Sequence, residues 1–243
     1  IPHGDLPVFE GATTYPCIIR INKSKPHNQP CVTVVKSLAF PSLECYVKEN
    51  CVVLDQTKFS DSGWFLGNQE ITNLLEKLNE DSLPLEQYVN GNIYRGILTG
   101  LNEAFVIDQA TRDKLISQDP KSQDLIKPFL IGRDIKRYKF EWKNKYLIFS
   151  RRGVKIKNYA AIYNYLLQFK DRLMPKPKDW SGGEWRGRKP GSYQWFEIQD
   201  SIDYYLEFEQ PKIIYPNICK RPEFSVDLEG YYSNQKSFII SQY

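Results

Sequence analysis

Apolar residues in this sequence come in short runs separated by charged and turn-forming residues. Runs such as Ile18-Ile19 and Ile213-Ile214-Tyr215 are only a few residues long, far from the ~20 needed to cross a bilayer. Such runs favour short strands and helices, and we expect no membrane association. With 243 residues and about 150 residues to a domain, the chain has room for one large or two small domains.

The chain begins at Ile1, without an initiator methionine or a leader, so we expect a piece of a longer protein. The only two histidines, His3 and His27, lie near the N-terminus, and no metal site is expected. The cysteines form no C-x-x-C pair and are expected to be free thiols in a reducing cytoplasm. They are Cys17, Cys31, Cys45, Cys51 and Cys219.

Positive charge is concentrated in residues 133–191, which we call the basic block. The formal net charge is +4, but the block alone holds 17 Lys and Arg against 5 Asp and Glu, and acidic residues are in excess on both sides of it. Of the 34 aromatic residues, 23 lie at or after residue 133. Cations neutralise phosphates and exposed rings stack on bases, so the block indicates a nucleic-acid surface. In the alternative interpretation, the rings belong to the core and the cations form a solvated face. It explains the block poorly, because there are too few acidic residues nearby to neutralise the charge.

Apolar spacing predicts the secondary structure. We expect buried strands at 15–21 and 31–35, and an amphipathic helix over 68–79 with Asn68 as its N-cap. A turn at 90–92 precedes Gly96 and Gly100, which permit positive φ or close backbone approach. Further on we expect strands at 104–107, 146–149, 212–215, 224–226 and 237–240, helices at 111–116 (capped by Asp108 or Thr111), 122–130 and 159–173, and a long loop over 174–192.

Signatures of catalysis are missing. The sequence has no glycine-rich phosphate loop and no Gly-x-Ser-x-Gly elbow, and its histidines are too few for a Ser-His or Cys-His site. Acidic pairs such as Asp200/Asp203 and Glu207/Glu209 are typical of a solvated helix face. Their spacing does not favour a nuclease cluster.

Four ordered blocks carry a family resemblance: GILTGLNEAF at 96–105, IKPFLIGRDIKRY at 126–138, GRKPGSYQWFEIQ at 187–199 and PKIIYPNI at 211–218. Together they resemble the TaqI-like C-terminal specificity domain of adenine-specific DNA methyltransferases and fused type IIG restriction-modification enzymes. We therefore expect an α+β fold with mainly antiparallel β-structure and several short helices. Remnant strands of an α/β methyltransferase domain are expected at the N-terminus.

The start of the chain, VFEGA at 8–12, is similar to the end of the catalytic domain in that family. The resemblance implies that Phe9 stacks on a flipped adenine, because an extruded base needs a flat apolar partner. The alternative is that Phe9 is an ordinary strand-edge core residue. The Asn-Pro-Pro-Tyr tetrapeptide and the cofactor loop of the family are absent. We therefore expect no catalytic residues and no cofactor in this piece, and S-adenosylmethionine in the parent enzyme.

The resemblance implies three parts: 1–60 as the last strands of the catalytic domain, 61–90 as a connecting helix and 91–243 as the target-recognition domain. The expected partners are double-stranded DNA and the remainder of a methyltransferase that is itself an enzyme and could carry an endonuclease. We expect phosphate contacts from Arg133, Lys136, Arg137, Arg151, Arg152 and Lys155. The reading element is expected in the loop, through Trp185, Arg186, Arg188, Lys189, Tyr193 and Trp195, with Thr99 and Asn102 also touching DNA.

Alternatives remain open from the sequence. The basic and aromatic pattern also suits an RNA or single-stranded nucleic-acid module. A carbohydrate- or protein-binding module could use Trp180, Trp185 and Trp195 as a platform. For Gly132-Arg133-Asp134, a buried Arg–Asp pair is the structural alternative to DNA contact.

Overall fold

A computed structural model describes residues 6, 8–9, 16–23, 29–59, 61, 63–64, 66 and 69–241. The chain divides into two compact units, residues 1–83 and 84–243, and each is described by itself. The fold is mixed α+β, with mainly antiparallel sheets and seven short helices in the described residues, as expected from the sequence. The assignment of the first strands to a methyltransferase remnant stays a prediction.

The first unit contains a two-stranded antiparallel sheet, β1 (Cys31–Val32) and β2 (Val52–Val53). Between these strands lies α1 (Leu43–Asn50), whose first turn is capped by the Ser42 hydroxyl. A 3₁₀ helix (Gln56–Lys58) and α2 (Gln69–Glu80) follow. Helix α2 confirms the helix predicted from apolar spacing, although its expected cap, Asn68, lies outside the described residues.

Two expectations for the first unit are wrong. Residues 16–21 form no strand, and Ile18, Ile19 and Ile21 are exposed. A strand needs a neighbour to satisfy its backbone groups, and the described residues offer this segment none. Cys31 and Cys51 are not free thiols. They form a disulfide with Cα atoms 5.7 Å apart, because the pairing of β1 with β2 brings them together.

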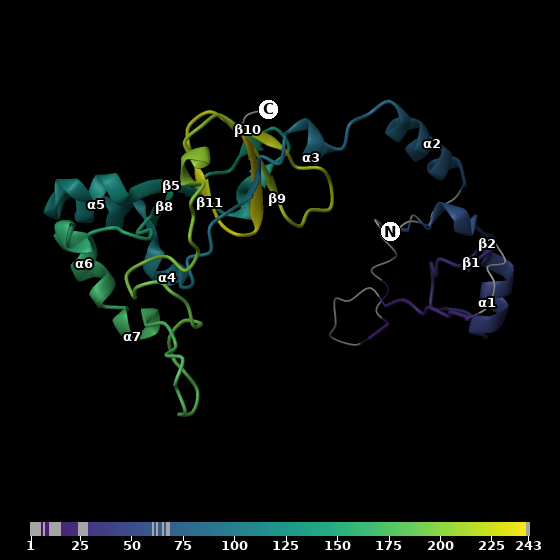
Figure 1. Cartoon of the computed structure of the whole chain (residues 1–243), viewed down its shortest axis with the longest axis horizontal. Coiled ribbons are helices and arrows are strands. Elements are labelled where there is room, and N and C mark those ends of the chain that lie inside the picture. Colours follow the sequence, from purple (N-terminus) through teal and green to yellow (C-terminus); the bar gives the residue numbers. More distant parts are fainter. Residues whose placement is uncertain are drawn as a thin grey trace. The chain divides into compact units, whose positions relative to one another are not determined.

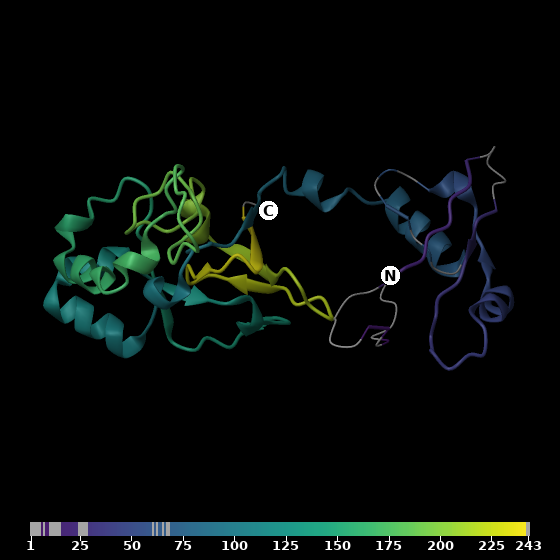
Figure 2. The ribbon, with the colours of Figure 1, turned by 90° about the horizontal axis from the view of Figure 1, so that it is seen from below.

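The second unit contains two four-stranded sheets (Figure 1). The first has the order β10-β9-β12-β3 and is antiparallel throughout; Figure 2 shows its C-terminal strands in yellow. Its strands are β3 (Ile93–Arg95), β9 (Lys212–Pro216), β10 (Ser225–Asp227) and β12 (Ser237–Ser241). The second has the order β11-β5-β8-β4, with only β11 and β5 parallel. Its strands are β4 (Val106–Asp108), β5 (Ile126–Leu130), β8 (Lys145–Ile148) and β11 (Tyr232–Ser233).

The helices of the second unit are short. They are α3 (Leu85–Tyr88), α4 (Asn102–Phe105), α5 (Gln109–Gln118), α6 (Ala160–Leu167) and α7 (Lys170–Leu173), with 3₁₀ helices at Pro120–Leu125, Gly132–Asp134, Ile156–Asn158 and Tyr205–Phe208. Strands β6 (Ile135–Lys136) and β7 (Lys139–Phe140) form a separate hairpin. One apolar core joins both sheets and the helices through buried side chains such as Phe105, Phe129, Leu147, Phe208 and Tyr232.

Gly96 and Gly100 have the properties expected of them. At Gly96 a Cβ atom would overlap the carbonyl of Asn234, where Ile97 bridges to Asn234 and connects the two sheets. Gly100 has a φ of +82°, a conformation that favours glycine. Both glycines therefore allow the backbone to turn into the core at this junction.

Three elements differ from the sequence prediction. Residues 126–130, predicted as helix, form strand β5, because Pro128 lacks the N–H that a helix interior needs and Ile126, Phe129 and Leu130 are buried in the sheet. The predicted strand at 104–107 begins as α4 and becomes β4 only at Val106. The helix predicted over 159–173 is interrupted after Leu167, where the Phe169 N–H bonds to Leu166 O in a tighter turn.

Candidate nucleic-acid interface

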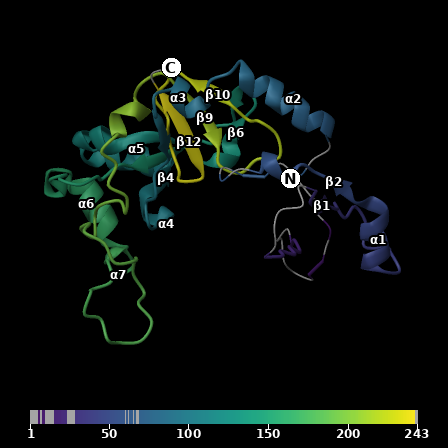
Figure 3. The same ribbon diagram turned by 45° about the vertical axis from the view of Figure 1, so that its right-hand side comes forward.

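The segment after α7 leaves the body of the second unit as a projecting loop, residues 175–188, which we call the arm (Figure 1 and Figure 3). Its two ends are paired by a parallel bridge between Pro175 and Arg188. The Lys176 N–H bonds to Arg188 O at 3.0 Å, and the Arg188 N–H bonds to Met174 O at 2.9 Å. The arm is therefore closed at its base by backbone hydrogen bonds.

Arg188 anchors this base. Its guanidinium is buried, with the residue only 4% exposed, and stacks on the Tyr193 ring with Cζ 4.3 Å from the centroid. It donates five hydrogen bonds to backbone carbonyls: Leu173 (2.8 Å), Thr99 (3.1 Å), Glu197 (2.7 Å), Gln194 (3.2 Å) and Trp195 (3.0 Å). Burial lowers its pKa to about 10, so it remains charged at neutral pH. Arg188 was expected to read a base, but its guanidinium donates its hydrogen bonds to carbonyls of the protein backbone instead.

Two tryptophans give the arm an internal packing. Trp180 and Trp185 meet edge to face with centroids 4.9 Å apart, a favourable geometry for aromatic rings. Trp185 Nε1 donates to Met174 O, and Trp180 Nε1 donates to Gly183 O. Trp180 keeps 41% of its surface exposed. The arm thus presents one exposed ring on an ordered backbone.

The exposed cations of the arm and of the residue that follows it are Lys178, Arg186 and Lys189. Within the part of the chain that the structure describes, their side chains have no acidic partner. Arg186 and Lys189 therefore remain available for an anionic ligand, and their contact with DNA stays a prediction. Lys178 was not singled out there, although its exposed position in the loop could have indicated it.

Several other predicted contacts support the arm from beneath. Tyr193 is buried and donates to Lys189 O. Arg152 donates to Ile198 O at 2.5 Å and to Gln199 O at 2.7 Å. Thr99 is buried and donates to Asn102 Oδ1 at 2.7 Å. Tyr193, Arg152 and Thr99 therefore stabilise the fold through these hydrogen bonds. Asn102 remains exposed.

Trp195 is partly buried and packs between two neighbours. Its ring lies 5.7 Å from that of Tyr163, and the Lys170 ammonium lies 5.7 Å from its centroid. The side chain therefore covers the core beside α6. It does not join the exposed ring of the arm in any contact that the structure records.

The β6–β7 hairpin and the 3₁₀ helix Gly132–Asp134 directly before it carry a second group of cations. Arg133 and Arg137 are exposed and Lys136 is half-buried. At the turn, Tyr138 has a φ of +65° and is 76% exposed, with the Arg137 Cζ 5.0 Å from its ring centroid. Asp134 pairs with Lys143 at 3.5 Å, so the buried Arg133–Asp134 pair considered from the sequence does not form.

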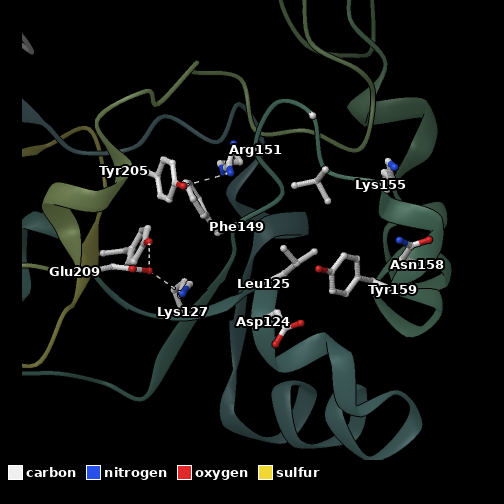
Figure 4. A pocket seen from close by; sticks show the side chains of 13 residues that line it. Asp124, Leu125, Lys127, Phe149, Arg151, Lys155, Asn158, Tyr159, Tyr205 and Glu209 are labelled. Atoms are coloured by element: carbon white, nitrogen blue, oxygen red, sulfur yellow. Dashed lines mark hydrogen bonds and ion pairs between the residues drawn. The ribbon is translucent and has the colours of Figure 1, made fainter.

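A pocket of about 450 Å³ brings together Arg151 and Lys155, two further predicted contacts (Figure 4). Arg151 lies over the Tyr205 ring at 4.3 Å and donates to the Tyr205 hydroxyl at 3.4 Å. Across the hollow, Lys127 forms an ion pair with Glu209 at 2.8 Å. That hydrogen bond from Lys127 holds the pKa of the Glu209 carboxyl below its ordinary value.

The remaining walls of the pocket come from Asp124, Asn158, Tyr159 and other side chains that the sequence analysis did not select. They belong to separate elements, so no local motif marks them. The adjacent residues Arg151 and Arg152 point in different directions: Arg151 contacts Tyr205 at the pocket, whereas Arg152 contacts the segment beneath the arm.

Phe9 lies in the first unit and is 57% exposed, and its neighbours Gly11 and Ala12 lie outside the described residues. Its contact with a flipped base stays a prediction. Among described residues, no cluster of three His, Cys, Asp or Glu side chains could hold a metal ion, and His3 and His27 are not described. No described helix is long and apolar enough to span a membrane.

Comparison with known proteins finds one family that matches part of this chain. Residues 127–243 match the TaqI-like C-terminal specificity domain. A solved structure of the type IIL restriction-modification enzyme MmeI in complex with DNA is similar with a TM-score of 0.41 and 10% identity, over 67% of this chain and 20% of that one. The chain thus spans about a fifth of that enzyme chain. The search of curated proteins found no match.

Proposed function

Because residues 127–243 form a TaqI-like C-terminal specificity domain, we propose that this chain binds double-stranded DNA sequence-specifically, as the target-recognition part of an adenine-N6 DNA methyltransferase of a restriction-modification system. The family match carries the proposal. The charge distribution supports it, because 17 of the residues in the basic block are cationic and only four of these form ion pairs among the described residues.

The contacts divide by chemistry. Arg133, directly before the β6–β7 hairpin, and Lys136 and Arg137 on it contact phosphates and set the register of the duplex. Cations held on a fixed backbone position the protein without reading sequence. The arm reads base edges through Arg186, whose planar fork can pair bidentately with guanine in the major groove. Asn102 and Lys189 contact the flanks of the site.

Methyl transfer belongs to the rest of the parent enzyme. S-adenosylmethionine carries a positive sulfonium, and the pocket shown in Figure 4 is lined by Arg151 and Lys155, whose charges repel a cation. The residues of this pocket therefore do not fit that cofactor. We assign to this piece recognition alone, with Phe9 reaching a flipped adenine in the assembled enzyme.

A selection from randomised duplex DNA tests the proposal. The full chain is expected to enrich one short motif and to bind it at least about 10³-fold more tightly than a scrambled duplex. Single-stranded RNA and a mixed glycan panel serve as competitors. Preferential binding of the RNA or of a glycan, or enrichment of no motif, would assign the chain to another class of binding module.

A further inference from the structure

Two cations at the pocket lack compensation. Arg151 and Lys155 belong to the same short segment between β8 and α6, and neither contacts a carboxylate in the described residues. Stacking on Tyr205 fixes the Arg151 guanidinium in place but leaves its charge unpaired. By contrast, Lys127 on the far wall is neutralised by Glu209. The uncompensated positive charge therefore lies at the side formed by residues 151–155.

The opposite side of the pocket has the complementary character. Asp124 lies across the hollow from Arg151 and Lys155, and the Tyr159 ring lies between them (Figure 4). The Asp124 carboxylate has no hydrogen-bond or ion-pair partner among the described residues. The pocket thus offers an anion site, a flat ring and a hydrogen-bond acceptor in succession.

We propose that this pocket binds one nucleotide unit, with its phosphate between Arg151 and Lys155, its base against Tyr159 and an amino group of the base directed to Asp124. A phosphate suits Arg because a guanidinium forms charge-assisted, bidentate hydrogen bonds to it. Stacking on an aromatic ring accommodates any base. An acceptor carboxylate favours adenine, cytosine or guanine, which carry exocyclic amino groups, over thymine and uracil, which carry none. A volume of about 450 Å³ lies within the usual range for a small ligand.

The nucleotide can come from solution or from a strand of bound DNA, in which case it must leave the duplex for its base to reach Tyr159. Only the second source rests on the proposed function. Binding of duplex DNA is therefore measured separately from binding of mononucleotide.

Calorimetric titration of the full chain with adenosine monophosphate is the primary test. We expect saturable binding, tighter than that of adenosine or inorganic phosphate, since each of those lacks one end of the ligand. Arg151→Gln and Lys155→Gln should each weaken it at least about tenfold, the loss expected for a hydrogen bond to a charged group. Lys157→Gln is the matched control. It removes the same charge two residues away from Lys155, outside the pocket, and should change affinity less than about twofold.

The Asp124 contact has its own test. Inosine monophosphate replaces the amino group of adenine by a carbonyl and should bind more weakly than adenosine monophosphate. Asp124→Asn should abolish most of this preference, because an amide can donate as well as accept. Thermal melting of each variant confirms that it folds. Lys155 is exposed, so its variant keeps the test valid if Arg151→Gln unfolds.

Competition identifies the source of the nucleotide. If adenosine monophosphate displaces bound duplex, the pocket takes a nucleotide from the strand; if both bind together, it takes a free nucleotide. The proposal is overturned if no saturable mononucleotide binding occurs up to about 10 mM, or if Arg151→Gln and Lys155→Gln behave like Lys157→Gln. Duplex binding that persists in such a case would leave the proposed function intact.

Discussion

Arg188 holds the base of the arm, which is part of the candidate interface. An arginine side chain has five N–H donors, and all five meet a carbonyl oxygen here. The acceptors come from α7, from the turn at Gly100 and from residues 194–197. One buried cation therefore joins the base of the arm to the core.

We expect Arg188→Met to cost about 3 kcal/mol or more in the free energy of unfolding, because it removes five hydrogen bonds to backbone carbonyls at the base of the arm. Arg188→Lys should retain only part of the stability that Arg188→Met loses, since an ammonium lacks the planar fork of a guanidinium. The control is Arg186→Met, two residues away and exposed, with an expected change within about 0.5 kcal/mol. Urea denaturation measures all three. Equal stability of the Arg188→Met and Arg186→Met variants would contradict the anchoring role.

The sequence cannot separate these two arginines. Arg186 and Arg188 share their residue type and their glycine- and proline-rich surroundings. Arg188 is buried because distant carbonyls converge on it, including that of Thr99, 89 positions earlier. The glycine and proline residues predict the loop from the sequence. Tertiary contacts determine which of the two arginines is buried as an anchor and which stays on the surface.

Glu209 makes the stability of the second unit depend on pH. Lys127 donates to its carboxylate at 2.8 Å and the Tyr232 hydroxyl at 2.9 Å, and the Lys127 hydrogen bond lowers its pKa from the ordinary value of 4.5. A carboxyl with a depressed pKa in the folded state stabilises the fold above its unfolded pKa, and this contribution is lost as pH falls through the folded pKa.

Glu209→Gln should therefore destabilise the protein at neutral pH, and the difference from the unsubstituted protein should shrink as the pH falls below about 4.5. The Glu209 side chain is 39% exposed, so solvent screening keeps the effect small. Thermal melting across acidic and neutral pH measures it. Glu184→Gln, an exposed position on the arm, serves as the control without this pH dependence. A constant difference at every pH would exclude the ion pair as its cause.

At the scale of elements, the spacing of apolar residues predicts those helices whose bounds depend on residues close together in the sequence. Helix α2 begins and ends within one residue of the prediction. Of the two caps considered for α5, Asp108 is the one that forms, through the Thr111 N–H. The prediction fails where pairing decides instead. Residues 126–130 contain enough apolar residues for a helix, but β8 and β11 on their two sides make them a strand.

The arm is an element that can be shortened without loss of the fold. Its base is closed by the bridge between Pro175 and Arg188, and the ring of Trp180 packs on that of Trp185 within the arm. Replacing residues 178–184 by a glycine pair, together with Arg186→Gln, should leave the melting temperature nearly unchanged, since all of these residues are exposed. Discrimination between the selected duplex and a scrambled one should fall at least about tenfold, the loss expected when a base pair is no longer read.

Competition binding of the two duplexes measures the change in discrimination. Lys157→Gln, which lies outside the arm, should retain the full preference. If the shortened protein still prefers the selected sequence as strongly, the reading element lies elsewhere, and the β6–β7 hairpin becomes the next candidate.

At the scale of the whole molecule, composition identifies the segment that carries the candidate interface but not the individual contacts. The basic block contains the hairpin, the segment 151–155 and the arm, all of which carry exposed or pocket-lining cations. It does not contain Asp124 or Tyr205, because a pocket is assembled from elements far apart in the chain. The net charge of a long segment can be counted directly from the sequence. The residues of a binding pocket cannot, because the fold brings them together from distant segments.

This distribution of charge predicts how the whole chain responds to salt. Cations that neutralise phosphates release condensed counterions, so the logarithm of the affinity falls linearly with the logarithm of salt concentration. With roughly 6–10 phosphate contacts, affinity for duplex DNA should drop about 10³–10⁵-fold between about 50 and 200 mM salt. Fluorescence anisotropy with a labelled duplex measures the slope. Arg137→Gln should make it shallower by about one contact, whereas Arg112→Gln should leave it unchanged, because that guanidinium is paired with Asp113 at 2.8 Å. An affinity that does not respond to salt would mean that the basic block does not face phosphates.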